Sequence, residues 1–182
     1  SVTTVTINGA PFTYTGAAQT PATVSVTGAN GVVLATPTAN YANNTNAGTA
    51  TASYTYAGDD NHEGSTDSKN FTIGQKAASV TPAANSKIYG AADPALTGST
   101  NGFVPSDNVI ASYSRTAGET VLGSPYTISA TLAPTGVLGN YNITYNTANF
   151  TISKAPSVTT VTINGATFTY TGAAQTPATV SV

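Results

Sequence analysis

The sequence contains no cysteine, methionine or tryptophan, and charged residues make up only 7% of its 182 positions. Without cysteine the chain forms no disulfide, offers no thiolate to a metal and has no cysteine nucleophile. Ordinary soluble domains carry roughly 25% charged residues, so polarity here must come from the hydroxyl and amide groups of Thr, Ser and Asn. This composition, with its many β-branched and aromatic residues, favours strands and turns.

Charge is scarce in both signs. Five basic residues and a net charge of -2 leave no basic stripe to neutralise phosphates, so we expect no nucleic-acid binding. Hydrophobic residues reach 40%, which predicts a folded chain. The longest aliphatic runs, such as Val32 to Ala35, fall far short of the roughly 20 residues that a membrane helix needs, so we expect no membrane span.

One long internal repeat dominates the sequence. Residues 157–182 repeat residues 1–26 at 25 of 26 positions, and the one difference is Thr167 in place of Pro11. Near-identity over this length indicates recent duplication, as in a long array of copies. Because no signal-peptide pattern precedes the first copy, we expect the sequence to begin inside a longer protein.

A shorter and weaker repeat divides the 156-residue period into two modules. Ser1-Val2, Ser79-Val80 and Ser157-Val158 are spaced 78 residues apart, and Lys76-Ala77 and Lys154-Ala155 stand just before the later two. We therefore predict one domain at residues 1–76, a second at 77–155, and the opening of a third module at 156–182.

Short alternating segments separated by Gly- and Asn-containing turns predict a small β-sandwich in each module. In the closing strand of the first module, Phe71 and Ile73 should face the core while Asn70 and Thr72 face solvent. The predicted strands are, in the first module, 2–7, 12–14, 22–26, 32–36, 49–56 and 68–73, and in the second, 79–81, 87–89, 95–97, 109–113, 126–132, 141–145 and 150–152. Turns are expected at 8–9, 30–31, 57–60 and 101–102.

The modules resemble two known repeat families. The first module resembles a bacterial Ig-like repeat in three runs, Tyr14-Thr15-Gly16-Ala17-Ala18, Tyr56-Ala57-Gly58-Asp59-Asp60 and Phe71-Thr72-Ile73. The second module resembles the MBG-type β-rich repeat in the runs Ile88-Tyr89-Gly90-Ala91-Ala92 and Asn140-Tyr141-Asn142-Ile143. The resemblance implies an extended array of small Ig-like β-sandwiches in a large secreted or surface-anchored bacterial protein. It implies no catalytic motif.

The densest polar cluster is the one place where a cation such as calcium would find several oxygen ligands. Its spacing does not match an EF-hand, and a solvated turn has the same composition, so we assign no metal-binding residue. The cluster consists of Asp59, Asp60, Asn61, His62, Glu63 and Asp67.

Catalysis is not expected. His62 is the only histidine, so no histidine pair can hold zinc, and a Ser-His-Asp set would have to use this residue. No catalytic or cofactor-binding residue is assigned. Lys87 and Asn149 invite the idea of an isopeptide crosslink between the first and last strands, but a plain surface pair is the preferred interpretation.

The sequence thus favours a structural segment of an extracellular stalk, fibre or adhesin shaft. Low charge and Thr-rich strand edges predict self-association into fibres, laterally or end to end, beyond contacts between neighbouring repeats. The alternative is adhesion to glycans or a cell surface through repeated loops, with the turn 58–67 as first candidate. Residues 156–182 are too few to bury a core, so either the continuing chain or another subunit must complete them.

Overall fold

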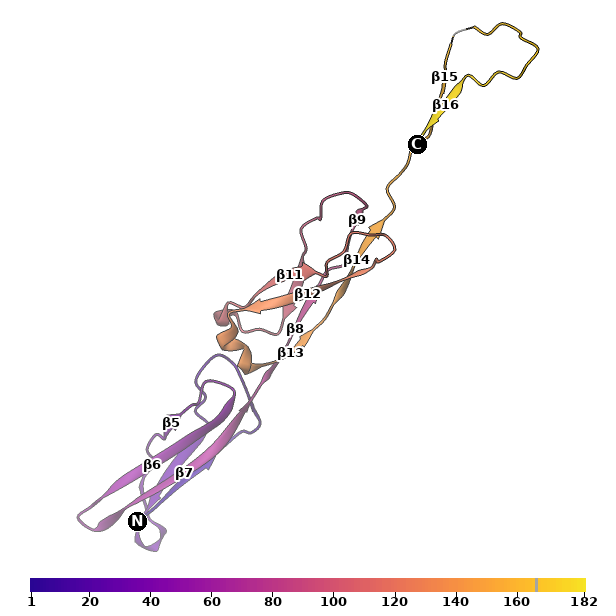
Figure 1. Cartoon of the computed structure of the whole chain (residues 1–182). Coiled ribbons are helices and arrows are strands. Elements are labelled where there is room, and N and C mark those ends of the chain that lie inside the picture. The colour runs from indigo at the N-terminus through magenta and orange to yellow at the C-terminus, as the bar shows by residue number, and fades with distance from the viewer. Residues whose placement is uncertain (166) are drawn as a thin grey trace.

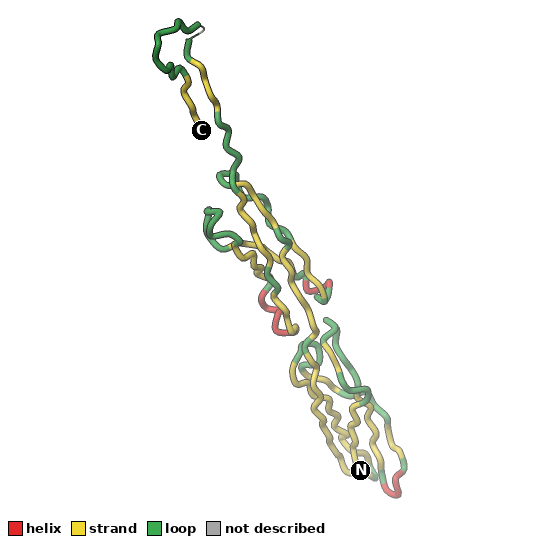
Figure 2. The backbone as a smooth tube through the Cα atoms, turned by 90° about the vertical axis from the view of Figure 1, so that its right-hand side faces the viewer, coloured by secondary structure: helices red, strands yellow, loops and turns green. Residues whose placement is uncertain are grey.

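The computed structural model describes residues 1–165 and 167–182 and is all-β. Helical structure in this part of the chain is limited to the short 3₁₀ segments η1 (Ala29–Gly31), η2 (Pro105–Asp107) and η3 (Thr135–Asn140). Two β-sandwiches and a C-terminal hairpin follow one another along a single long axis (Figures 1 and 2). The N-terminus lies at one end of this rod, and the hairpin lies at the other.

The first sandwich packs a three-stranded sheet, β1-β3-β4, against a four-stranded sheet, β2-β7-β6-β5. Its two longest strands form a hairpin with the two-residue turn Asp60-Asn61 at the N-terminal end of the rod. The strands are β1 (Val2–Ile7), β2 (Phe12–Thr13), β3 (Ala22–Thr27), β4 (Val33–Ala35), β5 (Asn40–Ala42), β6 (Gly48–Asp59) and β7 (His62–Gly74).

Alternation along the strands builds the first core, because successive side chains point to opposite faces of a sheet. Phe71 and Ile73 are buried and Asn70 and Thr72 are exposed, as predicted from the sequence. Phe12 packs edge-on against Phe71 with ring centroids 5.4 Å apart. Other buried members of this core are Val5, Val24, Ala50 and Ala52.

The second sandwich pairs the sheet β10-β8-β13 with the sheet β11-β12-β14-β9. Ile128, Phe150 and Ile152 are almost fully buried between the sheets, so the closing strand repeats the inward pattern predicted from the sequence. The strands are β8 (Lys76–Pro82), β9 (Asn85–Ile88), β10 (Gly98–Asn101), β11 (Ile110–Arg115), β12 (Tyr126–Ala133), β13 (Tyr141–Tyr145) and β14 (Ala148–Ser153).

Three local predictions are wrong. The strand expected at 95–97 lies instead at β10, because Gly98 provides the space that the Tyr113 ring fills: a Cβ there would stand 2.5 Å from the ring. The predicted turn at 101–102 therefore begins inside a strand. The turn expected at 57–60 moves to 60–61, because Gly58, at φ +94°, is accommodated within β6. Strand β5 was not predicted at all.

The C-terminal segment forms an antiparallel hairpin of β15 (Thr160–Ile163) and β16 (Ala178–Ser181). Residues 1–26, which this segment repeats, hold the strands predicted at 2–7, 12–14 and 22–26, and two strands are observed in the described residues here. The third counterpart, β2, owes its strand geometry to parallel pairing with β7, and the hairpin has no equivalent of β7 beside it.

We predict that Ile73→Ala lowers the free energy of unfolding of the first sandwich by about 2–5 kcal/mol, because the side chain is 1% exposed and its loss leaves a cavity. Urea unfolding followed by tyrosine fluorescence measures this change. The neighbouring Thr72→Ala, on the exposed face of the same strand, should change it by less than about 0.5 kcal/mol. Equal effects of the two substitutions would contradict the assigned faces.

Candidate functional site

The acidic turn lies at the tip of the β6–β7 hairpin. The carboxylate of Asp59 is occupied within the turn: it accepts hydrogen bonds from the Tyr56 hydroxyl at 2.6 Å and the Asn61 amide at 2.8 Å, and it contacts His62 Nδ1 at 2.9 Å. These contacts, led by the tyrosine bond, hold the pKa of Asp59 well below its usual range. The turn is therefore organised by its own side chains.

Asp67 does not join this turn. It lies on β7 opposite Tyr54, four residues beyond Glu63, a separation of about 13 Å along an extended strand. Its oxygens contact Lys69 Nζ at 2.8 and 3.0 Å and accept the Val5 amide at 2.8 Å, and these bonds lower its pKa. Within residues 1–165 and 167–182, no three His, Asp or Glu side chains come together as a metal-binding group.

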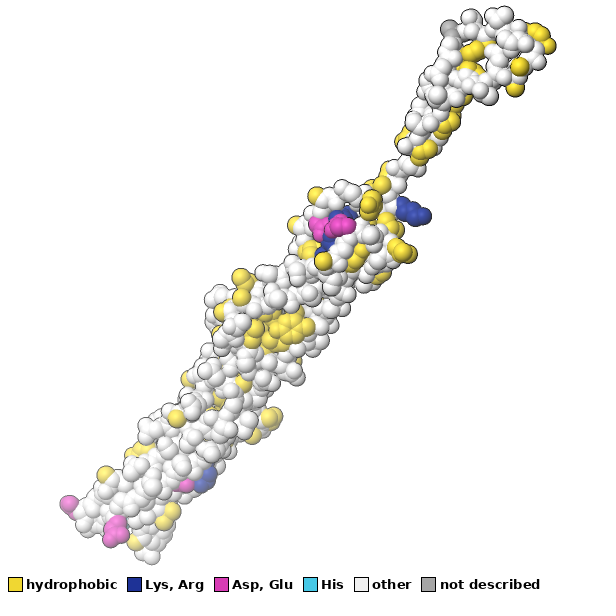
Figure 3. All heavy atoms as spheres, viewed as in Figure 1, with side chains coloured by type: hydrophobic (Ala, Val, Ile, Leu, Met, Phe, Trp, Pro, Cys, Tyr) yellow, Lys and Arg dark blue, Asp and Glu magenta, His cyan; other side chains and the backbone are white. Residues whose placement is uncertain are grey.

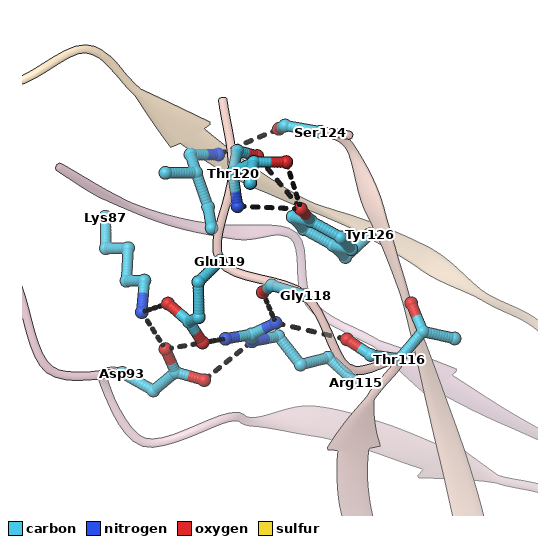
Figure 4. Close-up of polar contacts among 10 residues, drawn as sticks. Lys87, Asp93, Arg115, Thr116, Gly118, Glu119, Thr120, Ser124 and Tyr126 are labelled. Carbon is cyan, nitrogen blue, oxygen red and sulfur yellow. Dashed lines mark hydrogen bonds and ion pairs between the residues drawn. The ribbon is translucent and has the colours of Figure 1, made fainter. Parts of the chain in front are cut away.

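A second charged cluster, which the sequence analysis did not find, lies at the far end of the second sandwich (Figure 4). Lys87 on β9 and Arg115 at the end of β11 both contact Asp93 and Glu119, which stand in two separate loops. Lys87 Nζ lies 2.7 Å from Asp93, and Arg115 Nε lies 2.6 Å from the same carboxylate. Four of the chain's few charges thus tie two loops to two strands.

Both cations of this cluster are covered by their surroundings. Their side chains are 5% and 8% exposed, and the Arg115 guanidinium lies 4.7 Å from the ring centre of Phe150 and 5.4 Å from that of Tyr126. Arg115 also donates to the carbonyl of Gly118 at 2.6 Å. Hydrogen bonds from Arg115 and then Lys87 lower the pKa of Asp93 to about 2.

The preferred interpretation of Lys87 and Asn149 as a surface pair is wrong. Lys87 Nζ is held by the two carboxylates, while Asn149 pairs with Thr127 across β12 and β14. Sequence reasoning missed the cluster because its members are spread over 32 residues. The signal that could have found it was the scarcity of charge itself, since isolated charges in such a neutral chain need partners.

The third feature is the joint between the sandwiches. Only Gln75 separates the end of β7 from the start of β8, so the backbone passes directly from a sheet of one sandwich into a sheet of the next. The Gln75 side chain donates to the carbonyl of Gly139 in η3, at 3.0 Å. A connection of one residue, anchored on both sides by strand pairing, leaves little freedom to bend.

Asp107 is the polar centre of this joint. Its carboxylate accepts hydrogen bonds from Tyr14 of the first sandwich, at 2.9 and 3.1 Å, and from Tyr141 of the second. The two tyrosine rings pack edge to face with centroids 5.4 Å apart, and both side chains are buried. The pKa values of both tyrosines are raised, first by burial and second by the hydrogen bond to Asp107. The pKa of Tyr141 is raised to about 12.

Further contacts complete the joint on both sides. The side chain of Asn140, a residue only 7% exposed, bridges the two sandwiches. Its Oδ1 accepts a hydrogen bond from the Ala47 amide at 2.9 Å, and its Nδ2 donates one to Asn46 Oδ1 at 3.2 Å. Gly16, at φ +80°, lets the first sandwich approach so closely that a Cβ would stand 2.9 Å from Val104 Cγ1. Apolar residues of both sandwiches belong to one continuous hydrophobic cluster across this boundary.

Charge is distributed unevenly over the rod. On the face in Figure 3, charged side chains gather near the two ends of the paired sandwiches, and most of the surface between them is neutral. Among the tyrosines, Tyr14 and Tyr141 are buried in the joint, whereas Tyr89 and Tyr145 are about half exposed.

We predict that Tyr141→Phe destabilises the joint by about 1–3 kcal/mol at pH 8, because it removes a partner from Asp107 and from the Val104 amide. Since the folded pKa of Tyr141, about 12, lies above its ordinary value of 10, the wild-type advantage should be complete below pH 10 and be lost as the pH rises towards 12. Urea unfolding at pH 8 to 12 measures both. Tyr89→Phe, at an exposed position, is the control and should change stability little.

A second prediction concerns Asp93, whose pKa is lowered from 3.8 to about 2 in the folded chain. A carboxylate whose pKa is lowered on folding stabilises the folded chain above pH 4. This stabilisation is lost as the pH falls through 2. Asp93→Asn should therefore be less stable than wild type at pH 5, and the difference should shrink between pH 4 and pH 2. Chemical unfolding over this range tests it, and a constant difference would contradict the ion-pair assignment.

No helix in the described part of the chain is long and apolar enough to cross a membrane.

Comparison with known proteins identifies one part of the chain. No curated protein and no solved structure matches the chain. Residues 78–151, which hold most of the second sandwich and the Tyr89-Gly90-Ala91 run, match the family model for the MBG domain (YGX type). The MBG-type character predicted for the second module is thereby confirmed.

Proposed function

We propose that this chain is a structural segment of a long extracellular bacterial stalk, fibre or adhesin shaft. In this proposal a bacterial Ig-like sandwich at residues 1–76 alternates with an MBG-type sandwich at 77–155, and residues 156–182 open the next Ig-like unit. The MBG match supports the proposal, because this is a β-rich, non-catalytic repeat type found in surface proteins. No catalytic role is proposed.

The observation that carries the proposal is the joint. A shaft keeps a fixed extension only if its modules resist bending against one another. Here one residue joins the two sheets, two buried tyrosines meet on one carboxylate, and a buried asparagine bridges the gap. The cost of exposing these groups opposes bending, since a buried polar group that loses its partner costs about 1–3 kcal/mol.

The dimensions suit the same role. Strand β7 has 13 residues aligned with the rod axis, so the first sandwich is about 43 Å long at about 3.3 Å per residue. Because the sequence repeats after 156 residues, the length of such a shaft would grow with the number of copies. Neutral flanks between charged ends would also favour lateral association into fibres, since they carry little mutual repulsion.

Adhesion to glycans or a cell surface is the alternative. Its candidate contact is the tip of the β6–β7 hairpin, where Asp60 and Glu63 are exposed at the end of the rod. The internal bonding of Asp59 organises this tip but leaves no carboxylate pair aimed at one ligand position. The joint therefore supports the mechanical role more directly than any surface feature supports adhesion.

Distance measurement between spin labels tests the proposal, because the cysteine-free chain accepts two labels without background. Labels at Thr66→Cys and Thr131→Cys, both on exposed strand faces, report the angle between the sandwiches. We expect a single narrow distribution, which Asp107→Ala broadens because both tyrosines lose their shared acceptor.

Asp60→Ala is the matched control, since it removes the same charge at the distant turn and should leave the distribution narrow. A broad distribution in the unmodified chain would overturn the rigid-shaft proposal. So would the absence of any change in Asp107→Ala.

A further inference from the structure

The connections that follow the two sandwiches differ in length and chemistry. Only Gln75 separates the first sandwich from the second. After β14 the chain continues as Lys154-Ala155-Pro156-Ser157, and Val158 is the counterpart of Val2, where β1 begins. Pro156 has no amide hydrogen, so a ladder of strand hydrogen bonds cannot run through this connection. In the proposed shaft, side chains at the two facing ends are then what can hold the next unit in place.

The repeat brings Lys154 close to one residue of that next unit. In the first sandwich the Ser1 hydroxyl donates to the carbonyl of Glu63 at 2.7 Å, so the start of the unit lies against the β6–β7 hairpin. Ser157 repeats Ser1, and Lys154 precedes it by three residues, a distance of at most about 11 Å. The long, flexible side chain of Lys154 therefore reaches the position that Glu63 holds in a following copy.

Both charges are free to form this contact. Among residues 1–165 and 167–182, neither Lys154 nor Glu63 belongs to an ion pair, and both residues are exposed. In a chain with so few charges, a lysine and a glutamate at facing ends of successive units are complementary. The pair would also fix which end of one unit meets which end of the next.

Apolar side chains surround Lys154 at the end of the second sandwich. A shallow hollow of about 400 Å³ lies beside it, lined mainly by Tyr89, Val121 and Ala155. The Tyr89 amide donates to the carbonyl of Ser153 at 2.8 Å, which fixes the tyrosine next to the connection. Figure 3 shows hydrophobic and basic groups together at this end of the sandwich. The hollow can therefore receive apolar groups of a neighbouring unit.

The opposite end of the period carries matching apolar groups. Val2 and Val33 stand on either side of Thr27 across the first sheet. Their own sandwich leaves them 61% and 57% exposed, although all of its strands are present. They lie at the same end as Ser1 and its contact with Glu63. Each end thus combines an apolar patch with one charge, and the two charges are opposite in sign.

We propose that these ends form a second joint of the shaft, in which Lys154 pairs with the residue that corresponds to Glu63 in the following Ig-like unit. The apolar positions of that unit cover the hollow beside Tyr89. This inference rests on the proposed shaft function, because it requires an Ig-like unit to follow residue 156. It deepens that function by naming the surfaces through which one period meets the next.

The two joints then differ in their response to salt. At the first joint, Asp107 is bonded to two buried tyrosines, which dissolved ions do not reach. At the second joint the ion pair is exposed, and exposed pairs are weak and are screened as ionic strength rises. The short connection keeps the two ends at a high effective concentration, so a weak pair is enough to hold them at low salt. High salt should therefore loosen every second joint.

Spin-label distances in a chain that continues the repeat test this joint. Residues 27–155 appended after Val182 complete a second period. Labels at Thr131→Cys and at Thr66→Cys of the second copy report the second joint, and Thr131→Cys with Thr66→Cys of the first copy reports the first joint. We expect a narrow second-joint distribution at about 0.01 M salt that broadens at about 1 M, where the screening length has fallen about tenfold. The first-joint distribution should not change.

Substitutions locate the effect. Lys154→Gln should broaden the second-joint distribution at low salt to its high-salt width. Lys69→Gln in the first copy removes the same charge from an exposed residue far from this joint, so it is the matched control and should leave the distribution narrow. Lys154→Glu should also broaden the distribution, and adding Glu63→Lys in the second copy should restore it, because the pair is then reversed.

Three results would each refute the second joint: a distribution that is already broad at low salt, one that stays narrow in Lys154→Gln, or a charge reversal that restores nothing. The first-joint labels distinguish this failure from failure of the shaft. Their distribution stays narrow if only the second joint is wrong, and it is broad if the shaft proposal itself is wrong. A narrow first-joint distribution in each variant also shows that its sandwiches are folded.

Discussion

The structure depends on one shared carboxylate. Asp107 lies where two sandwiches meet and accepts hydrogen bonds from a tyrosine of each, so neither tyrosine can move without leaving a buried polar group unsatisfied. The one-residue connection at Gln75 and the bridging amide of Asn140 act in the same direction. Together these contacts join the two small cores into a single straight body.

Scarcity of charge gives each ion pair a defined place. The cluster around Arg115 ties the loops at one end of the second sandwich, and the turn around Asp59 orders the opposite end of the first. Between these ends the surface is largely neutral, so neighbouring rods would repel one another weakly. Cohesion within the chain thus combines apolar burial with hydrogen bonds, and the few charged groups that contribute stand at defined places, among them the Asp107 carboxylate and the cluster around Arg115.

The repeat places the same residues in two different surroundings. The hairpin at residues 157–182 carries the same tyrosine, glycine and valine positions that build the first sandwich and its joint. In the first copy those residues meet strands β6 and β7 and Asp107, and they become core. In the second copy no strand equivalent to β6 or β7 lies beside them among the described residues, so the same side chains are exposed there.

The sequence alone determined the all-β class, the 156-residue period and the inward faces of the closing strands, because each follows from local alternation or direct repetition. The MBG-type character of the second module came from a resemblance between motifs. Only the tertiary structure decided that a strand begins at Gly98, that Lys87 contacts Asp93 and Glu119, and that Tyr14 contacts Asp107. Those contacts join residues 6 to 93 positions apart or depend on space around a glycine. Patterns within one strand carry no information about such distant neighbours.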